Sequence, residues 1–137
     1  MKTFEKIKEV AFAFDRELFP GRNLHLSFII YKGRIIAIGQ NSRKTHPINL
    51  KNRKINKDGV DISGIKGTCS ELATILTVIR RTNVPLNKCT IVNIRINQNN
   101  RINNSKPCLS CEKLIKHFDI SKIIYSDKNG GFTKIIL

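Results

Sequence analysis

The sequence predicts an α/β protein, a three-layer α/β/α sandwich built on a mixed five-stranded sheet. Segments with apolar residues at three- and four-residue steps, typical of helices, alternate with segments rich in β-formers. The predicted order is helix, two strands, helix, strand, helix, two strands. Short turn signals make the first and last strand pairs antiparallel. The strands at 88–96 and 121–126 are expected to be parallel, because a helix connects them by a right-handed crossover.

The N-terminal part is expected to form a helix followed by a hairpin. In residues 3–18 the apolar side chains recur at helical spacing, so they form one stripe. The hairpin at 24–40 consists of two segments rich in β-formers, with Lys32-Gly33 as the turn between them. The apolar stripe is made up of Phe4, Ile7, Ala11, Phe14 and Leu18.

The C-terminal half is expected to add two helices and three strands. Pro107 suits the first turn of a helix, where a backbone N–H has no partner to lose. Asn129-Gly130-Gly131 predicts a tight turn before the last strand. Cys89 begins a strand and is expected to be a buried structural thiol, and 97–106 an Asn-rich loop. The predicted elements are helices at 69–82 and 107–118 and strands at 88–96, 121–126 and 132–137.

Length and composition favour one domain in a reducing compartment. A chain of 137 residues is long enough for one hydrophobic core, so we expect a single domain over 1–137. Residues 1–5 lack the apolar region of a secretory signal, and no apolar run approaches the ~20 residues of a membrane span. We therefore expect a cytoplasmic protein with no membrane partner. The formal charge of +15 is compatible with a polyanionic partner, and equally with a compositional bias of the coding DNA.

Three of the four cysteines lie in two short motifs that carry the chemistry of the chain. A Cys-x-Glu motif opens the second predicted helix at Cys69, and a Pro-Cys-x-x-Cys motif opens the third at Cys108 and Cys111. The last two lie on one helix face, about one turn apart. Cys69 lies 39 positions before Cys108, so only the fold can bring it to the pair. Three thiolates and one open position make up the ligand count of a catalytic zinc rather than a structural one.

The carboxylate of the first motif, Glu71, has two possible roles. It lies two residues after Cys69, which makes it a general acid/base candidate beside a metal. Alternatively, Thr68 and Glu71 fit a capping box, in which the carboxylate bonds to the Thr68 amide. The presence of the Pro-Cys-x-x-Cys partner favours the catalytic role. Helix starts also suit thiolates, because the helix N-terminus favours negative charge.

The paired motifs resemble those of the zinc-dependent cytidine/deoxycytidylate deaminase superfamily. The resemblance covers roughly residues 24–137 and implies a cytidine deaminase-like fold. It implies that Cys69, Cys108 and Cys111 hold Zn²⁺ with water in the fourth position. Glu71 would pass the proton of this water to the pyrimidine ring nitrogen and then to the leaving amine, while hydroxide attacks C4 of cytosine. Proteins of this kind often form homo-dimers or homo-tetramers.

The resemblance also implies where substrate binds. Asn41 occupies the place of an Asn that binds the sugar of the substrate, although Asn is also common in turns. The segment 41–57 contains no acid and several bases, and it leads to the first motif, so its charges could meet phosphates. The alternative is a solvated insertion. The candidate substrate contacts are Asn41, Arg43, Lys44, His46 and Ser70.

One position departs from a pattern common in the superfamily. Typical tetrameric cytidine deaminases follow the Glu with an Arg that offsets thiolate charge, whereas this chain has Leu72. Together with the basic segment, this favours a phosphate-bearing substrate over free cytidine. We expect a deoxycytidylate-type nucleotide ahead of single-stranded DNA or RNA. The alternatives from other classes are a zinc-stabilised nucleic-acid-binding module without turnover and an interaction protein that has lost activity.

Overall fold

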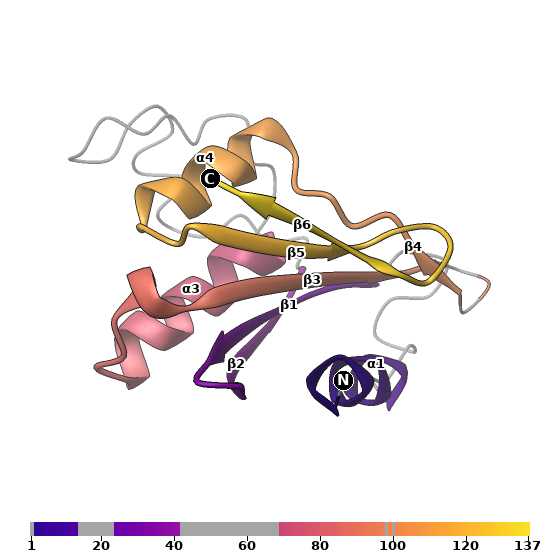
Figure 1. The fold of residues 1–137 in the computed structure, drawn as a ribbon, viewed down its shortest axis with the longest axis horizontal. Coiled ribbons are helices and arrows are strands. Elements are labelled where there is room, and N and C mark those ends of the chain that lie inside the picture. The colour runs from indigo at the N-terminus through magenta and orange to yellow at the C-terminus, as the bar shows by residue number, and fades with distance from the viewer. Residues whose placement is uncertain (1, 14–23, 42–68, 98, 100) are drawn as a thin grey trace.

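The protein is a three-layer sandwich around one mixed sheet (Figure 1). The computed structural model describes residues 2–13, 24–41, 69–97, 99 and 101–137. Helices α3 (Ser70–Arg81) and α4 (Leu109–His117) pack on one face of the sheet, and α1 (Lys2–Ala13) packs on the other. This arrangement confirms the predicted α/β class. It also places the two helices that begin at the cysteine motifs in the same layer.

The sheet contains the five predicted strands in the order β2-β1-β3-β5-β6, and a short sixth strand, β4, pairs with β3. The β3–β5 pair is parallel, as expected for strands joined through a helix, and the other pairs are antiparallel. The tight turn at Asn129 therefore gives the antiparallel β5–β6 pair that the sequence predicts. The strands are β1 (Leu24–Tyr31), β2 (Arg34–Gln40), β3 (Thr90–Ile96), β4 (Ile102–Asn103), β5 (Lys122–Ser126) and β6 (Phe132–Ile136).

Two stretches differ from the predicted elements. Strand β4 lies within 97–106, which was expected to be a loop, and its two residues are too few to show an alternating pattern. Helix α4 begins at Leu109 with Cys108 as its N-cap, so Pro107 lies before the helix rather than in its first turn. The first helix was predicted over residues 3–18. Its last five predicted residues, 14–18, lie outside the described part of the chain.

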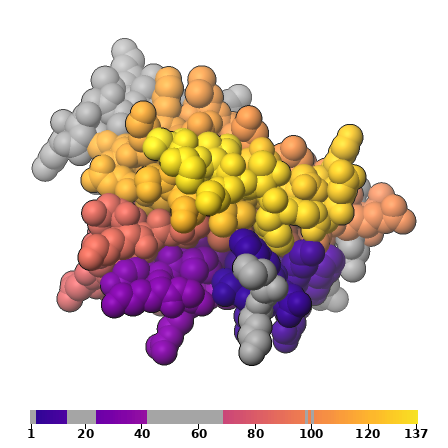
Figure 2. All heavy atoms as spheres, viewed as in Figure 1, coloured from indigo at the N-terminus to yellow at the C-terminus, as the bar shows by residue number. Residues whose placement is uncertain are grey.

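Helix α1 covers the sheet face opposite the cysteine motifs. Its Phe4 ring stacks on Phe132 of β6 with ring centroids 4.8 Å apart, and the Lys8 ammonium lies 5.6 Å from the same ring. Figure 2 shows α1 in indigo against the yellow C-terminal strands on this side of the molecule. No helix in the described ranges is long and apolar enough to cross a membrane.

The start of α3 lies unusually close to strand β2, and Gly39 permits this approach. A Cβ atom at Gly39 would lie 2.6 Å from the backbone N of Thr74 and 2.7 Å from the carbonyl O of Ser70. Both of these are backbone atoms, which cannot rotate away as a side chain can. The missing side chain therefore fixes the distance between the sheet and the helix turn that carries Glu71.

We expect Gly39→Ala to destabilise the protein by about 1–3 kcal/mol, because the added methyl must push α3 off the sheet. Denaturant unfolding would measure this as a lower midpoint with an unchanged slope. Gly131→Ala is the matched control, because its Cβ would meet only the end of the Asp127 side chain, at 3.0 Å. Equal midpoints for the two variants would contradict the close-approach argument.

Candidate metal centre

The two cysteine motifs meet where α3 and α4 begin. Cys69 is the N-cap of α3, and its sulfur accepts a hydrogen bond from the Leu72 amide at 3.3 Å. Cys108 is the N-cap of α4, and its sulfur accepts from the Cys111 amide at 3.5 Å. Each sulfur thus satisfies an N–H group that the helix leaves free.

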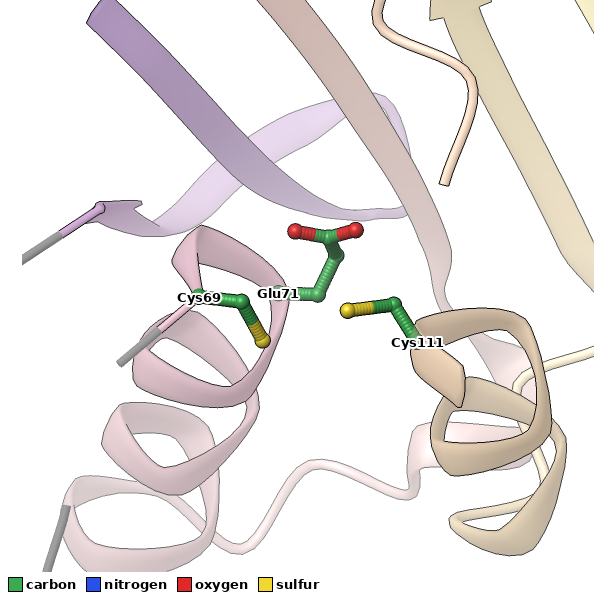
Figure 3. Close-up of side chains that lie close together, drawn as sticks. All are labelled: Cys69, Glu71 and Cys111. Atoms are coloured by element: carbon green, nitrogen blue, oxygen red, sulfur yellow. The ribbon is translucent and has the colours of Figure 1, made fainter. Parts of the chain in front are cut away.

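Three side chains converge between these helix starts. The ligand atoms of Cys69, Glu71 and Cys111 all lie within 4.8 Å of one another. Figure 3 shows the two sulfurs facing each other between α3 and α4, with the Glu71 carboxylate turned towards the strands. Thiolate sulfur and carboxylate oxygen are both common zinc ligands. The group therefore has the donor chemistry of a zinc site, with donor atoms close enough to surround one ion.

The other two cysteines lie outside this close group. Cys108 is exposed and lies one helical turn before Cys111, at the same helix end. Cys89 is buried in the hydrophobic core, and its thiol donates a hydrogen bond to the Pro85 carbonyl at 3.4 Å. The prediction that Cys89 is a buried structural thiol is therefore confirmed. The structure brings two of the three proposed thiol ligands together with the carboxylate.

The Glu71 carboxylate is almost completely buried, with 6% of the residue exposed. Burial raises its pKa, because the ionised form loses its hydration. Hydrogen bonds from its own backbone amide and from Ser70, Asn93 and Cys111 act in the opposite direction. The carboxyl group thus holds a proton more readily than an exposed glutamate, which suits a group that must both accept and donate protons.

The Cys111 thiol is also strongly perturbed. Its hydrogen bond with Cys69 raises its pKa most, followed by its burial and by the negative charges of Glu71, Cys69 and Cys108. Several acidic groups therefore lie close together, and the negative charge of one raises the free energy of ionising the next. A divalent cation between them favours the ionised forms, because an opposite charge lowers a thiol pKa. The residues present fit such an ion.

The helix cap at this site differs from the capping-box alternative for Glu71. That alternative makes Thr68 the N-cap of the helix, whereas α3 has Cys69 in this place. Thr68 itself lies outside the described residues. The Glu71 carboxylate is directed into the space between the helix and the sheet, where Ser70 donates to its Oε1 at 2.9 Å.

The predicted substrate contacts are only partly within the described chain. Asn41 directly follows β2. Its side-chain Oδ1 accepts a hydrogen bond from the backbone amide of His25, and its backbone amide donates to the His25 carbonyl, both at 3.1 Å. The Ser70 side chain is buried, and its hydroxyl contacts Glu71 and Ser27. The roles of both in substrate binding stay predictions. Arg43, Lys44 and His46 lie outside the described residues.

A histidine and an arginine lie side by side on the strands next to Asn41. His25 of β1 pairs with Arg95 of β3. Burial and the positive charge of Arg95 lower the pKa of His25 to about 4, so this imidazole is neutral at pH 7. The Nε of Arg95 is buried and has no hydrogen-bond partner among the described residues.

Two polar residues of this layer were missed by the sequence reasoning. Ser27 of β1 and Asn93 of β3 are both buried, at 0% and 3% exposed. The alternation of Asn93 and Arg95 with apolar residues is typical of a strand with one face in solvent, but β3 lies between β1 and β5 with both faces covered. The available signal was that a strand in a parallel pair is covered on both faces, so a polar residue within it needs a buried partner.

Residues 1–127 match the family described as the cytidine and deoxycytidylate deaminase zinc-binding region. The match includes both cysteine motifs and the carboxylate. No curated protein matches the chain significantly.

Proposed function

Because the chain belongs to the cytidine and deoxycytidylate deaminase family, we propose that it hydrolyses the amino group of cytosine in a phosphate-bearing substrate. The chain is a zinc-dependent deaminase of the cytidine/deoxycytidylate type. The observation that carries the proposal is the buried Glu71 carboxylate beside two thiols at the meeting of two helix starts. A deoxycytidylate-type nucleotide is the favoured substrate.

Cys69 and Cys111 are the proposed zinc ligands that lie closest together, and Cys108 is the proposed third. All three lie at helix starts, where the sulfurs of Cys69 and Cys108 accept hydrogen bonds from backbone amides. When bound, Zn²⁺ supplies a Lewis acid that lowers the pKa of water to about 7. Glu71 is left out of the ligand set because a proton carrier must keep its carboxylate oxygens available.

Glu71 is proposed to move the protons of the reaction. Hydrolysis of cytosine to uracil forms a C4–O bond and breaks the bond from C4 to the amino nitrogen, which leaves as ammonia. A base must accept a proton from the attacking water, and an acid must protonate ring N3 and then the leaving amine. The Glu71 carboxyl can serve in both roles, because its pKa lies above that of an exposed glutamate.

The phosphate requirement is supported by the charge of the chain and by Arg95. The formal charge is +15, and the bases between residues 43 and 57 lead to the first motif in the sequence. Arg95 lies two residues beyond Asn93 on β3, and its buried Nε would gain a partner from an anionic acceptor. Leu72, buried with Leu76 and Leu114, provides no cation to offset the thiolates.

A comparison of substrates at several salt concentrations tests the proposal. We expect the zinc-loaded protein to release ammonia from dCMP with a higher kcat/KM than from cytidine. Increasing salt should lower this value only mildly for a nucleotide. Single-stranded DNA that contacts several phosphates would instead show a log–log slope of about 0.7 per phosphate. Equal, salt-independent turnover of cytidine would contradict the phosphate requirement.

A charge variant and a matched control extend this test. Replacing Lys51, Arg53, Lys54 and Lys57 with Ser should weaken polynucleotide turnover greatly and nucleotide turnover little, because one phosphate engages few cations. The control removes the same charge from exposed positions elsewhere, by replacing Lys6, Arg80, Lys128 and Lys134 with Ser. Equal losses in both variants would assign the effect to net charge alone. The single domain over 1–137, a homo-dimer or homo-tetramer, and a cytoplasmic location stay predictions.

A further inference from the structure

A buried chain of polar side chains runs from Glu71 into the centre of the sheet. The Ser70 hydroxyl contacts Glu71 Oε1 at 2.9 Å and the Ser27 hydroxyl at 2.8 Å. The Ser27 hydroxyl in turn donates to Asn93 Oδ1 at 2.6 Å. All four residues are at most 6% exposed. The chain therefore joins the first turn of α3 to two neighbouring strands.

The Asn93 side-chain amide is held at both ends in this network. Its Oδ1 accepts from Ser27, and its Nδ2 donates to the Ser105 carbonyl at 3.4 Å. Ser27 and Ser105 thus hold the amide from two sides. The hydroxyls of Ser27 and Ser70 connect this amide to the Glu71 carboxylate.

The backbone around Asn93 makes this a rigid support. Asn93 pairs with Ser27 across β1 and with Tyr125 across β5, so it lies in the middle of the sheet. The Ser105 hydroxyl donates to the Asn93 carbonyl at 2.9 Å and ties the approach to α4 to the same strand. A side chain anchored in this way has little freedom to turn.

Burial of these polar groups is costly unless every one of them is paired. The same layer contains a hydrophobic cluster, in which Ile29, Ile75 and Ile91 are completely buried. Polar groups in such a layer lose their hydrogen bonds to water, and the hydrogen bonds that they form within the protein offset little more than this loss. A protein with apolar residues of the same shape at these positions can therefore be as stable. A contribution to stability is therefore a weak reason for an amide here, and a contribution to the site is a stronger one.

We propose that Asn93, held by Ser27 and Ser105, is a positioning residue that fixes the Glu71 carboxylate for proton transfer. The inference rests on the proposed deaminase function. A glutamate side chain has three rotatable bonds, and proton transfer requires a heavy-atom distance of about 2.6–3.2 Å. Without Asn93, the Ser27 and Ser70 hydroxyls that lead to the carboxylate lose their anchor in the sheet, and fewer molecules hold the reactive geometry.

Asn93→Ala in the zinc-loaded protein is the central test. We expect kcat to fall by about 10–100-fold, the usual size of effect for a partner that orients a site residue. KM and zinc content should stay close to the wild-type values, because Asn93 belongs to neither the proposed ligands nor the proposed substrate contacts. The assay is ammonia release from whichever cytosine substrate the wild-type protein uses best, with rates normalised to bound zinc.

Ser126→Ala is the matched control. It removes a completely buried hydroxyl that contacts the Asn103 carbonyl and the Ser105 hydroxyl, and that makes no direct hydrogen bond to Asn93 or Glu71. We expect a lower Tm with kcat within about twofold of wild type. A merely structural role for Asn93 predicts instead that both variants lose kcat in proportion to their loss of Tm, and that result would overturn the proposal.

Ser27→Ala provides a second variant in case Asn93→Ala folds poorly. It breaks the link between Asn93 and Ser70 with little change of volume, so a fall in kcat similar to that of Asn93→Ala is expected. In the double variant, the loss of Ser27 should cost little beyond the loss of Asn93, because both act through one carboxylate. Retention of full kcat by Ser27→Ala and Asn93→Ala overturns the positioning role alone. Absence of turnover in zinc-loaded wild type overturns the deaminase function as well.

Discussion

Glu71→Gln is expected to lower kcat by about 10²–10⁴-fold while the protein keeps its zinc and its fold. The amide has nearly the shape of the carboxyl group, so packing against Ser70 and Asn93 is retained, but it cannot carry a proton between water and the base. Rates of ammonia release per bound zinc measure the effect. The metal content of the variant, determined alongside, separates a loss of proton transfer from a loss of the metal.

The stability of the same variant has a definite expected sign. Burial raises the pKa of Glu71 in the folded state. In metal-free protein, the stability from its bound proton is fully present below the unfolded pKa and is lost as the pH rises through the folded pKa. At neutral pH, Glu71→Gln should therefore unfold no more easily than wild type. A helix-capping role predicts the reverse, a loss of about 0.5–2 kcal/mol with turnover intact.

Glu112→Gln is the control for this experiment. Glu112 lies in the first turn of α4, directly after Cys111, so the same chemical change is made beside the other motif. Its carboxylate is not part of the Cys69, Glu71 and Cys111 group. We expect kcat close to wild type. If Glu71→Gln were as active as Glu112→Gln, the assignment of Glu71 as the acid/base would be wrong.

The second large effect expected is the loss of zinc from Cys111→Ser. The wild-type protein should carry about one zinc per chain. The Cys111 sulfur faces Cys69 in the buried part of the site, and a serine hydroxyl is a far weaker ligand than a thiolate. Metal analysis after dialysis against a weak chelator should find most of the zinc gone. Turnover should fall with it.

Two further cysteine variants define the ligand set. Cys89→Ser changes the same atoms in the core, away from the site, and should keep its zinc. Cys108→Ser tests the exposed thiol that caps α4, and it should lose zinc if this sulfur is the third ligand. Loss of zinc from Cys89→Ser with retention in Cys111→Ser would show that the ligand set is wrong.

Local sequence patterns predicted most of the fold, because each element carries its own periodicity. The stripe of Leu72, Ile75, Leu76 and Ile79 predicted the buried face of α3, where the first three are buried and Ile79 is 48% exposed. The turn at Lys32-Gly33 predicted the β1–β2 hairpin. The motifs predicted that Cys69 and Cys111 meet although 42 positions separate them. This prediction was possible because thiols in these motifs are typical zinc ligands, and ligands of one zinc ion must lie close together in the fold.

The parts that escaped prediction depend on contacts between distant residues. Nothing next to Asn93 in the sequence indicates that Ser27 pairs with it, because strand register is a property of the sheet. The tight contact at Gly39 likewise involves α3, more than thirty positions later. Strand β4 has too few residues for any periodicity. Local sequence patterns therefore do not predict the contacts between strands that support the site.

The two halves of the metal centre lie on either side of β3 in the chain, and this links metal supply to folding. Helix α3 precedes β3 and α4 follows it, so the ligands lie together in a fold in which β3 is paired with both β1 and β5. An ion that binds this assembled state and not the unfolded chain shifts the folding equilibrium by mass action. Once the site is saturated, each tenfold rise in free zinc adds about 1.4 kcal/mol to the stability of the folded state. The abundance of active protein in a cell would then follow the local zinc concentration as well as the rate of synthesis.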